Sequence, residues 1–129
     1  MNIKRLTPNL YVDNVAECAK FWTERLHFQK TVEVPEDGGR LAFVALQKDG
    51  IEVMYGSYAS LDREPLVGPS LYQKGTSYLF IEVDNLDELV AAMKDLPKIV
   101  EVHKTFYGST EFTVKDPGAH FITFAQFGK

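Results

Sequence analysis

Residues 10–17, Leu-Tyr-Val-Asp-Asn-Val-Ala-Glu, have a near copy in residues 81–88, Ile-Glu-Val-Asp-Asn-Leu-Asp-Glu. Each copy begins with an alternating apolar run, which is typical of a half-buried strand, and continues into an amphipathic stretch. Asn14 and Asn85 lie at the junction, where a short side-chain oxygen can accept from an otherwise unpaired N–H of a helix. The repeat indicates an internal duplication. A chance match among capping and core residues is the alternative.

The spacing of apolar residues predicts one helix in each half of the chain. The first runs over residues 15–26, where apolar side chains fall at helical spacing and form one face. The second runs over residues 86–95 and ends before Pro97, because proline cannot continue a helix. A turn precedes the last strand of each half, at residues 48–50 and 115–118. The middle strands are expected at residues 27–34, 40–47, 99–105 and 110–115.

These elements predict the α+β fold class, with two tandem β-α-β-β-β modules in a single domain of residues 1–129. The first module covers residues 1–57 and the second covers residues 77–129. Residues 58–76 are rich in proline and glycine, so they are expected to form a linker with at most one helical turn. Connections of this length are often functional.

Composition limits the classes of protein to which the chain can belong. Its 129 residues, of which 45% are hydrophobic, are enough for one globular domain with a real core. A net charge of −4 without clustered cations argues against nucleic acid as a partner. Cys18 is the only cysteine, which excludes an internal disulfide and any paired-cysteine metal motif. Because no membrane span and no signal peptide are recognised, we expect a cytoplasmic protein.

Motifs typical of one protein family lie at residues 10–14, 21–22, 26–28, 107–112 and 115–120. Together they resemble the vicinal oxygen chelate superfamily, which includes glyoxalase I, extradiol dioxygenases, fosfomycin-resistance enzymes and bleomycin-resistance proteins. Each motif alone is weak, but their order is fairly specific and spans almost the whole chain. Trp22 and His27 replace the family's usual Tyr and Gly. In character the chain is most similar to the metal-free bleomycin-resistance type.

The resemblance implies a curved mixed sheet around a cleft, with helices on its outer face, and it implies homodimers. It also implies that the family's enzymes hold a divalent metal through His, Gln or Glu on the first and last strands of each module. Counted from the helix caps, these positions fall on Thr7, Met54, Tyr78 and Thr123. None is a good ligand for such an ion, so we expect neither a metal nor another cofactor. Glu52 and Glu111 are the candidates if the strand register differs.

No catalytic residue is predicted. His27, His103 and His120 have no His or Glu partner at ligand spacing, and an isolated histidine is more often packed or on the surface. Cys18 lies on the apolar face of the first helix, where it behaves as a small core residue. No serine lies in a nucleophile-elbow motif, and no glycine-rich phosphate loop is present.

Strand alternation predicts which side chains line the cleft. If Leu10 and Val12 face the helix, their neighbours face the opposite side, and the same argument applies to the other strands. The result is an apolar, largely aromatic wall with few polar groups, the usual form of a small-molecule site. Core packing is the alternative for these aromatic residues, and a surface position is the alternative for Glu82 and Glu111. The predicted ligand-binding residues are Asn9, Tyr11, Glu52, Met54, Tyr78, Phe80, Glu111, Phe121 and Thr123.

Three functions are compatible with these features. The leading prediction is non-catalytic binding of a small cationic or aromatic molecule, resembling antibiotic-sequestering bleomycin-resistance proteins, in clefts completed by a homodimer. The second is a metal-dependent lyase of the glyoxalase I kind or a glutathione-transferring enzyme. The third is an interaction or regulatory module whose cleft is vestigial.

Overall fold

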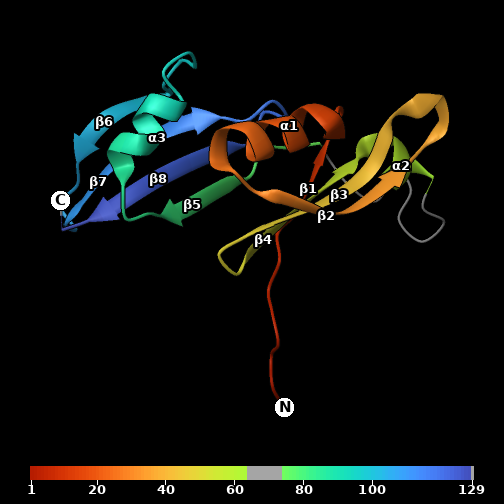
Figure 1. The fold of residues 1–129 in the computed structure, drawn as a ribbon, viewed down its shortest axis with the longest axis horizontal. Helices are drawn as coiled ribbons and strands as arrows, with labels where there is room; N and C mark the ends of the chain where they lie inside the picture. Colours follow the sequence, from red (N-terminus) through yellow and green to blue (C-terminus); the bar gives the residue numbers. More distant parts are fainter. Residues whose placement is uncertain (64–73, 129) are drawn as a thin grey trace. The chain divides into compact units, whose positions relative to one another are not determined.

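A computed structural model describes residues 1–63 and 74–128, and its contacts divide the chain into two compact units, Met1–Gly75 and Thr76–Lys129. Each unit contains a four-stranded mixed sheet with a helix on one face, so the predicted α+β class is confirmed (Figure 1). Residues 64–73, the middle of the expected linker, lie outside the described residues. Within the described ranges, every helix is too short or too polar to traverse a lipid bilayer.

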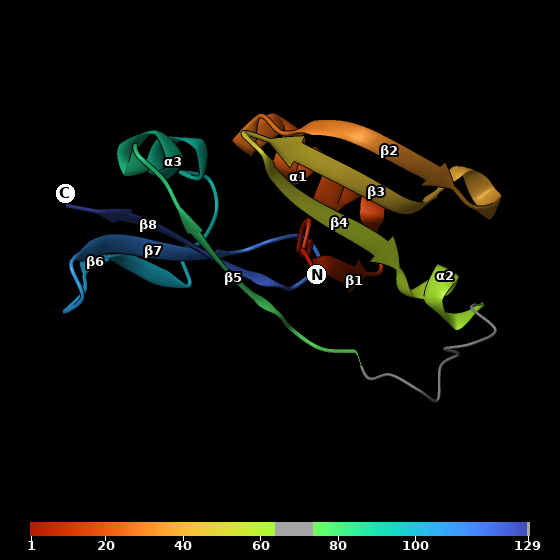
Figure 2. The ribbon, with the colours of Figure 1, turned by 90° about the horizontal axis from the view of Figure 1, so that it is seen from below.

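The first unit has the strand order β1-β4-β3-β2, with β1 parallel to β4 and the other neighbours antiparallel. Helix α1 covers one face of this sheet, and the short helix α2 follows β4 directly (Figure 2). The elements are β1 (Asn9–Val12), α1 (Val15–Leu26), β2 (Gln29–Pro35), the 3₁₀ helix η1 (Asp37–Gly39), β3 (Leu41–Lys48), β4 (Ile51–Ser57) and α2 (Tyr58–Asp62).

The second unit repeats this topology with the strand order β5-β8-β7-β6 and the helix α3 on one face. Strands β5 and β8 are parallel, and β8 pairs with β7 in the antiparallel sense. The elements are β5 (Tyr78–Glu82), α3 (Leu86–Ala92), β6 (Val100–Lys104), β7 (Ser109–Lys115) and β8 (Phe121–Phe127).

Both predicted helix caps are confirmed. The Asn14 side chain accepts a hydrogen bond from the Glu17 backbone N–H at 3.1 Å, and Asn85 accepts from the Glu88 N–H at 3.2 Å. Each amide oxygen thus pairs one of the N–H groups that a helix leaves without an internal partner. The repeated Val-Asp-Asn segment therefore ends a strand and begins a helix in both units.

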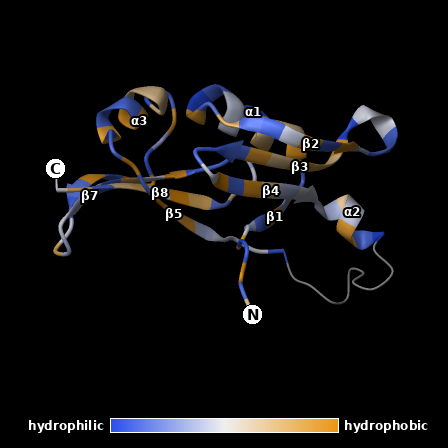
Figure 3. Cartoon of the chain, turned by 60° about the horizontal axis from the view of Figure 1, so that its bottom comes forward, coloured by the Kyte–Doolittle hydropathy of each residue, from blue (hydrophilic) through white to orange (hydrophobic). Residues whose placement is uncertain are grey.

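The core of the first unit is built around Trp22. Trp22 is 1% exposed. Its indole N–H donates at 2.8 Å to the hydroxyl of Tyr55, which lies on the helix-facing side of β4. The ring of Phe28 packs edge-on against Trp22 with centroids 4.8 Å apart. Figure 3 shows the matching hydropathy pattern, with hydrophilic residues on the visible side of α1 and hydrophobic residues along β3. The contact between Trp22 of α1 and Tyr55 of β4 therefore holds the helix against the sheet.

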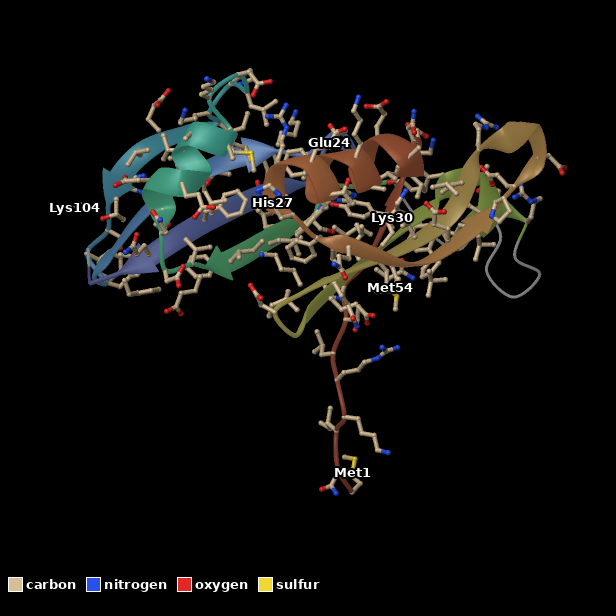
Figure 4. The ribbon with its side chains drawn as sticks, in the orientation of Figure 1. Met1, Glu24, His27, Lys30, Met54 and Lys104 are labelled. Atoms are coloured by element: carbon tan, nitrogen blue, oxygen red, sulfur yellow. The ribbon has the colours of Figure 1, made fainter. Side chains whose placement is uncertain are left out.

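The strand after α1 begins later than predicted. Strand β2 starts at Gln29 rather than His27, because His27 is the C-cap of α1 in the left-handed conformation (φ 60°, ψ 30°). The backbone N–H of His27 donates to the Trp22 carbonyl, which closes the helix. This is the conformation that glycine adopts most readily at a helix end. His27 lies exposed at that end of α1 (Figure 4).

Replacing His27 with glycine is expected to stabilise the protein by about 0.5–1 kcal/mol, because glycine pays no steric penalty for a positive φ. Part of the gain is offset by the greater freedom of glycine in the unfolded chain. Chemical denaturation followed by circular dichroism measures the change. His27→Ala is the control, since alanine carries the same left-handed penalty. An equal gain in the alanine variant would show that the backbone conformation is not the cause.

Helix α3 ends three residues earlier than predicted, at Ala92 instead of Asp95. Beyond Ala92 the chain continues in turns with hydrogen bonds between residues three apart, as in a 3₁₀ helix. Lys94 N–H donates to the Ala91 carbonyl, and Leu96 N–H donates to the Met93 carbonyl. Met93, the C-cap, has left the helical conformation at φ −109° and ψ 12°, so the helix ends before Pro97 can affect it.

The turn before β8 was predicted at residues 115–118, and its left-handed residue is Ala119, with a φ of 67°. The buried Asp116 carboxylate holds the turn, since its Oδ1 accepts from the backbone N–H groups of Gly118 at 2.9 Å and His120 at 2.8 Å. These bonds select the backbone conformation, so the left-handed residue follows the aspartate by three positions.

Candidate functional site

In the first unit, the sheet face opposite α1 carries four of the predicted ligand-binding residues. The parallel register places Asn9 opposite Met54 and Tyr11 opposite Gly56. Because side chains alternate along a strand, Asn9 and Tyr11 of β1 share this face with Glu52 and Met54 of β4. Figure 4 shows the Met54 side chain pointing away from α1.

The ring of Tyr11 lies directly on the backbone of Gly56. A Cβ at residue 56 would lie 2.7 Å from Cε1 of Tyr11, which is too close for any ordinary contact. The ring of Tyr58, at the start of α2, lies 6.4 Å from Tyr11 between centroids, and the ammonium of Lys74 lies 4.7 Å from the Tyr58 ring centroid. Glycine at position 56 therefore makes room for an aromatic group that sits close to the strand.

The Glu52 carboxylate on the same face accepts hydrogen bonds at both oxygens. Its Oε1 accepts from Arg5 Nη1 at 3.0 Å and from Thr7 Oγ1 at 2.9 Å, and its Oε2 accepts from Gln47 Nε2 at 3.2 Å. The Glu52 side chain is 12% exposed, whereas the Arg5 side chain is 66% exposed. Two neutral side chains thus orient the Glu52 carboxylate, and Arg5, from the segment before β1, forms an ion pair with it.

In the second unit, the sheet face opposite α3 presents aromatic rings to solvent. Tyr78 of β5 and Phe121 of β8 are neighbours in the parallel register, and their rings stack with centroids 4.9 Å apart at 23°. Tyr78 is 75% exposed and Phe80, two residues along β5, is 55% exposed. The ammonium of Lys115 lies 5.5 Å from the Phe121 ring centroid. These side chains form a flat apolar surface with a cation at its border.

A pair of threonines lies beside these rings. Thr123 of β8 is the register partner of both Phe80 on β5 and Thr113 on β7. The hydroxyl oxygens of Thr123 and Thr113 are 2.7 Å apart, within hydrogen-bond distance. This pair adds a polar group to an otherwise apolar face.

Glu111 is 5% exposed, so the surface position considered for it is wrong. Its Oε2 accepts from the Tyr107 hydroxyl and from Ser109 Oγ, the latter at 2.7 Å. The hydrogen bond to Glu111 raises the pKa of Tyr107, because losing the phenolic proton would set two negative charges side by side. The Tyr107 phenol therefore stays protonated as a hydrogen-bond donor, and the Glu111 carboxylate is hydrogen-bonded within the protein.

The four positions implied for a metal lie at matching places in the two units. Met54 pairs with Asn9, which is two residues after Thr7, and Thr123 pairs with Phe80, which is two residues after Tyr78. A thioether, two hydroxyls and a phenol do not fit a divalent ion that prefers carboxylate or imidazole ligands. Across residues 1–63 and 74–128, no three His, Cys, Asp or Glu side chains form a group that could hold a metal.

Two of the histidines and the cysteine serve the fold. His120 is 3% exposed, and its Nδ1 accepts from the Ser77 N–H at 2.9 Å, which ties the start of β5 to the turn before β8. His103 is exposed on β6, where it is the register partner of Glu111. Cys18 is fully buried in α1, as predicted for a core residue.

Several residues near these faces were not predicted from the sequence. Tyr58 follows the last strand of the first unit, and Gln47 precedes the turn before that strand. Arg5 lies in a segment without regular structure. The partners of Arg5 and Tyr58 are 47 residues away, so no local pattern indicates these two residues. Ser109 was also not predicted, although alternation places it on the same strand face as Glu111, and the predicted turn at residues 48–50 could have indicated Gln47 as the partner of Glu52.

The chain matches the family model of the Glyoxalase/Bleomycin resistance protein/Dioxygenase superfamily over residues 3–124. Similar solved structures include TioX from Micromonospora sp. ML1, with a TM-score of 0.79 and 14% identity over 97% of this chain and 99% of that one. Lactoylglutathione lyase from Agrobacterium tumefaciens has a TM-score of 0.77 and 15% identity, covering 97% of this chain and 94% of the other. None of the curated proteins matches the chain in sequence.

The chain therefore belongs to the Glyoxalase/Bleomycin resistance protein/Dioxygenase superfamily, as its motifs indicated. The similar structures are only 14% and 15% identical to this chain, so they establish the fold and leave the activity to the residues of this chain.

Proposed function

We propose that this protein binds a small organic molecule, aromatic or cationic, without catalysing a reaction on it. Binding of this kind would sequester the molecule, as in the bleomycin-resistance type. The proposed contacts are those predicted from the sequence, and the exposed ring of Tyr78, stacked on the half-buried ring of Phe121, carries the proposal. Large aromatic rings exposed side by side on a strand face cost solvation energy, which a planar ligand would recover.

The polar groups on these faces suit recognition more than chemistry. Thr123 offers a hydroxyl beside the rings of the second unit, and Asn9 offers an amide on β1 of the first. Sparse polar groups in an aromatic wall are typical of sites that orient a ligand.

Replacing Tyr78 with alanine is expected to weaken binding of a flat aromatic cation by about 1–3 kcal/mol, or about 5- to 150-fold in Kd, because a stacking surface is lost. Ethidium is a suitable probe, since its fluorescence rises when it leaves water. A titration with wild-type and variant protein gives the two dissociation constants.

Phe106→Ala is the matched control for the Tyr78 variant. Phe106 is 100% exposed in the same unit but lies on the hairpin between β6 and β7. Its removal should leave ethidium binding unchanged. Equal weakening in both variants would indicate nonspecific adhesion to exposed aromatic rings, and unchanged binding in the Tyr78 variant would remove this ring from the site.

We also propose that the protein is a cytoplasmic homodimer, on the basis of its single buried cysteine and of the family's frequent dimers. Sedimentation equilibrium of the purified chain tests the dimer. Metal analysis followed by an assay with methylglyoxal and glutathione tests the alternative activity. A stoichiometric divalent metal that supports turnover would favour the lyase over simple binding.

A further inference from the structure

We propose that Glu52 forms a subsite for the cationic group of a ligand, and that Arg5 of the same chain fills this subsite when no ligand is bound. The cationic group would be an amidinium, guanidinium or ammonium. The inference rests on the proposed function, because it assumes that the exposed strand face of the first unit receives an organic molecule. It adds the chemical class of the group that binds there and an internal competitor.

The Glu52 carboxylate is held in place by neighbouring side chains of the first unit. Thr7 and Gln47 donate to different oxygens of the Glu52 carboxylate, at 2.9 and 3.2 Å, so neutral groups orient it without neutralising it. Only 12% of the Glu52 side chain is exposed. A partly desolvated carboxylate binds a cation more strongly than one in bulk water. The site therefore favours a positively charged donor.

The Arg5 side chain, by contrast, is weakly constrained. Arg5 lies before β1 in a segment without helix or strand, and 66% of its side chain is exposed. Only the arginine side of this ion pair is exposed, and ordering its long side chain on an irregular segment offsets part of the attraction to Glu52. A ligand cation that is already rigid avoids this cost and can therefore replace the guanidinium of Arg5.

The neighbouring side chain on β4 gives the ligand an apolar contact. Met54 lies two residues beyond Glu52 on the same face, which is about 7 Å along the strand. A planar ring attached to a bound amidinium would reach this distance. The thioether of methionine is flexible and polarizable and adapts to such rings. Glu52 and Met54 together thus suit a ligand with a cationic head and an apolar body.

The test uses benzamidine, a ring with an amidinium, and benzamide as its neutral counterpart. Both are titrated into the full-length protein labelled with ¹³C at the methionine methyl groups. Benzamidine is expected to shift the Met54 signal in a saturable manner, and benzamide is expected to leave it in place. The signal of Met93, which is fully buried in the second unit, reports that this unit is intact, and the fluorescence of the buried Trp22 reports the same of the first unit.

Two variants separate the roles of the ion pair. Arg5→Ala removes the competitor, so benzamidine should bind about two- to fivefold more tightly. Glu52→Gln keeps the shape but removes the charge, so binding should weaken about tenfold or more. Raising the salt concentration should weaken binding to the wild type.

Unchanged or weaker benzamidine binding in Arg5→Ala would show that Arg5 does not occupy the subsite and would overturn the inference. Wild-type affinity in Glu52→Gln, an equal response to benzamide, or no Met54 shift in any variant would do the same. The ethidium titration with Tyr78→Ala is read separately. If ethidium fails to bind while the benzamidine pattern holds, the aromatic face of the second unit is at fault and the Glu52 subsite stands.

Discussion

Trp22→Ala is expected to lower the free energy of unfolding by about 3–5 kcal/mol, the range for removing a large buried aromatic side chain. Trp22 is 1% exposed and fills the space between α1 and its sheet, against Phe28 and Tyr55. Truncation leaves a cavity and also removes the donor to the Tyr55 hydroxyl. Since small domains are stable by only about 5–15 kcal/mol, the variant should be close to unfolding at body temperature.

The measurement is urea denaturation followed by circular dichroism, because Trp22 is the only tryptophan and its removal abolishes the usual fluorescence signal. Tyr55→Phe separates the hydrogen bond from the packing. It keeps the ring but removes the acceptor, and should cost about 1–3 kcal/mol. Phe106→Ala, on an exposed ring, should change stability by less than about 0.5 kcal/mol. A loss below about 1.5 kcal/mol in Trp22→Ala would contradict the central role of this ring.

Asp116→Ala is expected to destabilise the second unit by about 2–4 kcal/mol. The side chain is 3% exposed and its Oδ1 accepts from two backbone N–H groups, those of Gly118 and His120. Hydrogen bonds to a charged group contribute more than neutral ones, and their loss leaves the His120 N–H buried without this acceptor. The turn also holds Ala119 at a positive φ, a conformation that the bare backbone would not keep.

Asp116→Asn is the matched control, since it retains an oxygen at the same position without the charge. It should lose less than half as much stability as the alanine variant. Denaturation is followed by circular dichroism and by Trp22 fluorescence, which reports on the first unit. If Asp116→Ala and Asp116→Asn are equally destabilised, the charge and not the acceptor geometry holds the turn.

Local patterns predicted the regular elements well because their causes are local. Helix α1 begins at Val15 and ends at Leu26, as the apolar spacing and the Asn14 cap indicated. The errors lie where a helix end was involved. His27 was assigned to a strand although it caps a helix, and Asp95 was assigned to a helix although the chain has already tightened before Pro97. Propensity alone does not separate these choices.

The strand faces could also be anticipated, because alternation depends only on the chain direction and one buried residue. Tyr78 and Phe80 lie on the face opposite the helix for the same reason as Asn9 and Tyr11. What alternation cannot supply is the partner of each side chain. Glu52 and Glu111 looked alike in sequence, yet one meets an arginine and the other lies buried under a phenol and a hydroxyl.

Local sequence patterns are sufficient to predict the duplicated strand–helix unit, the caps that start both helices and the family to which the chain belongs. These features follow from residues close together in the chain, where periodicity and short side-chain bonds act directly. Contacts between distant segments arise only in the folded chain, where Arg5 meets Glu52 across 47 residues and Gly56 makes room for Tyr11. Such contacts depend on strand register and side-chain volume, which exist only once distant segments have packed together.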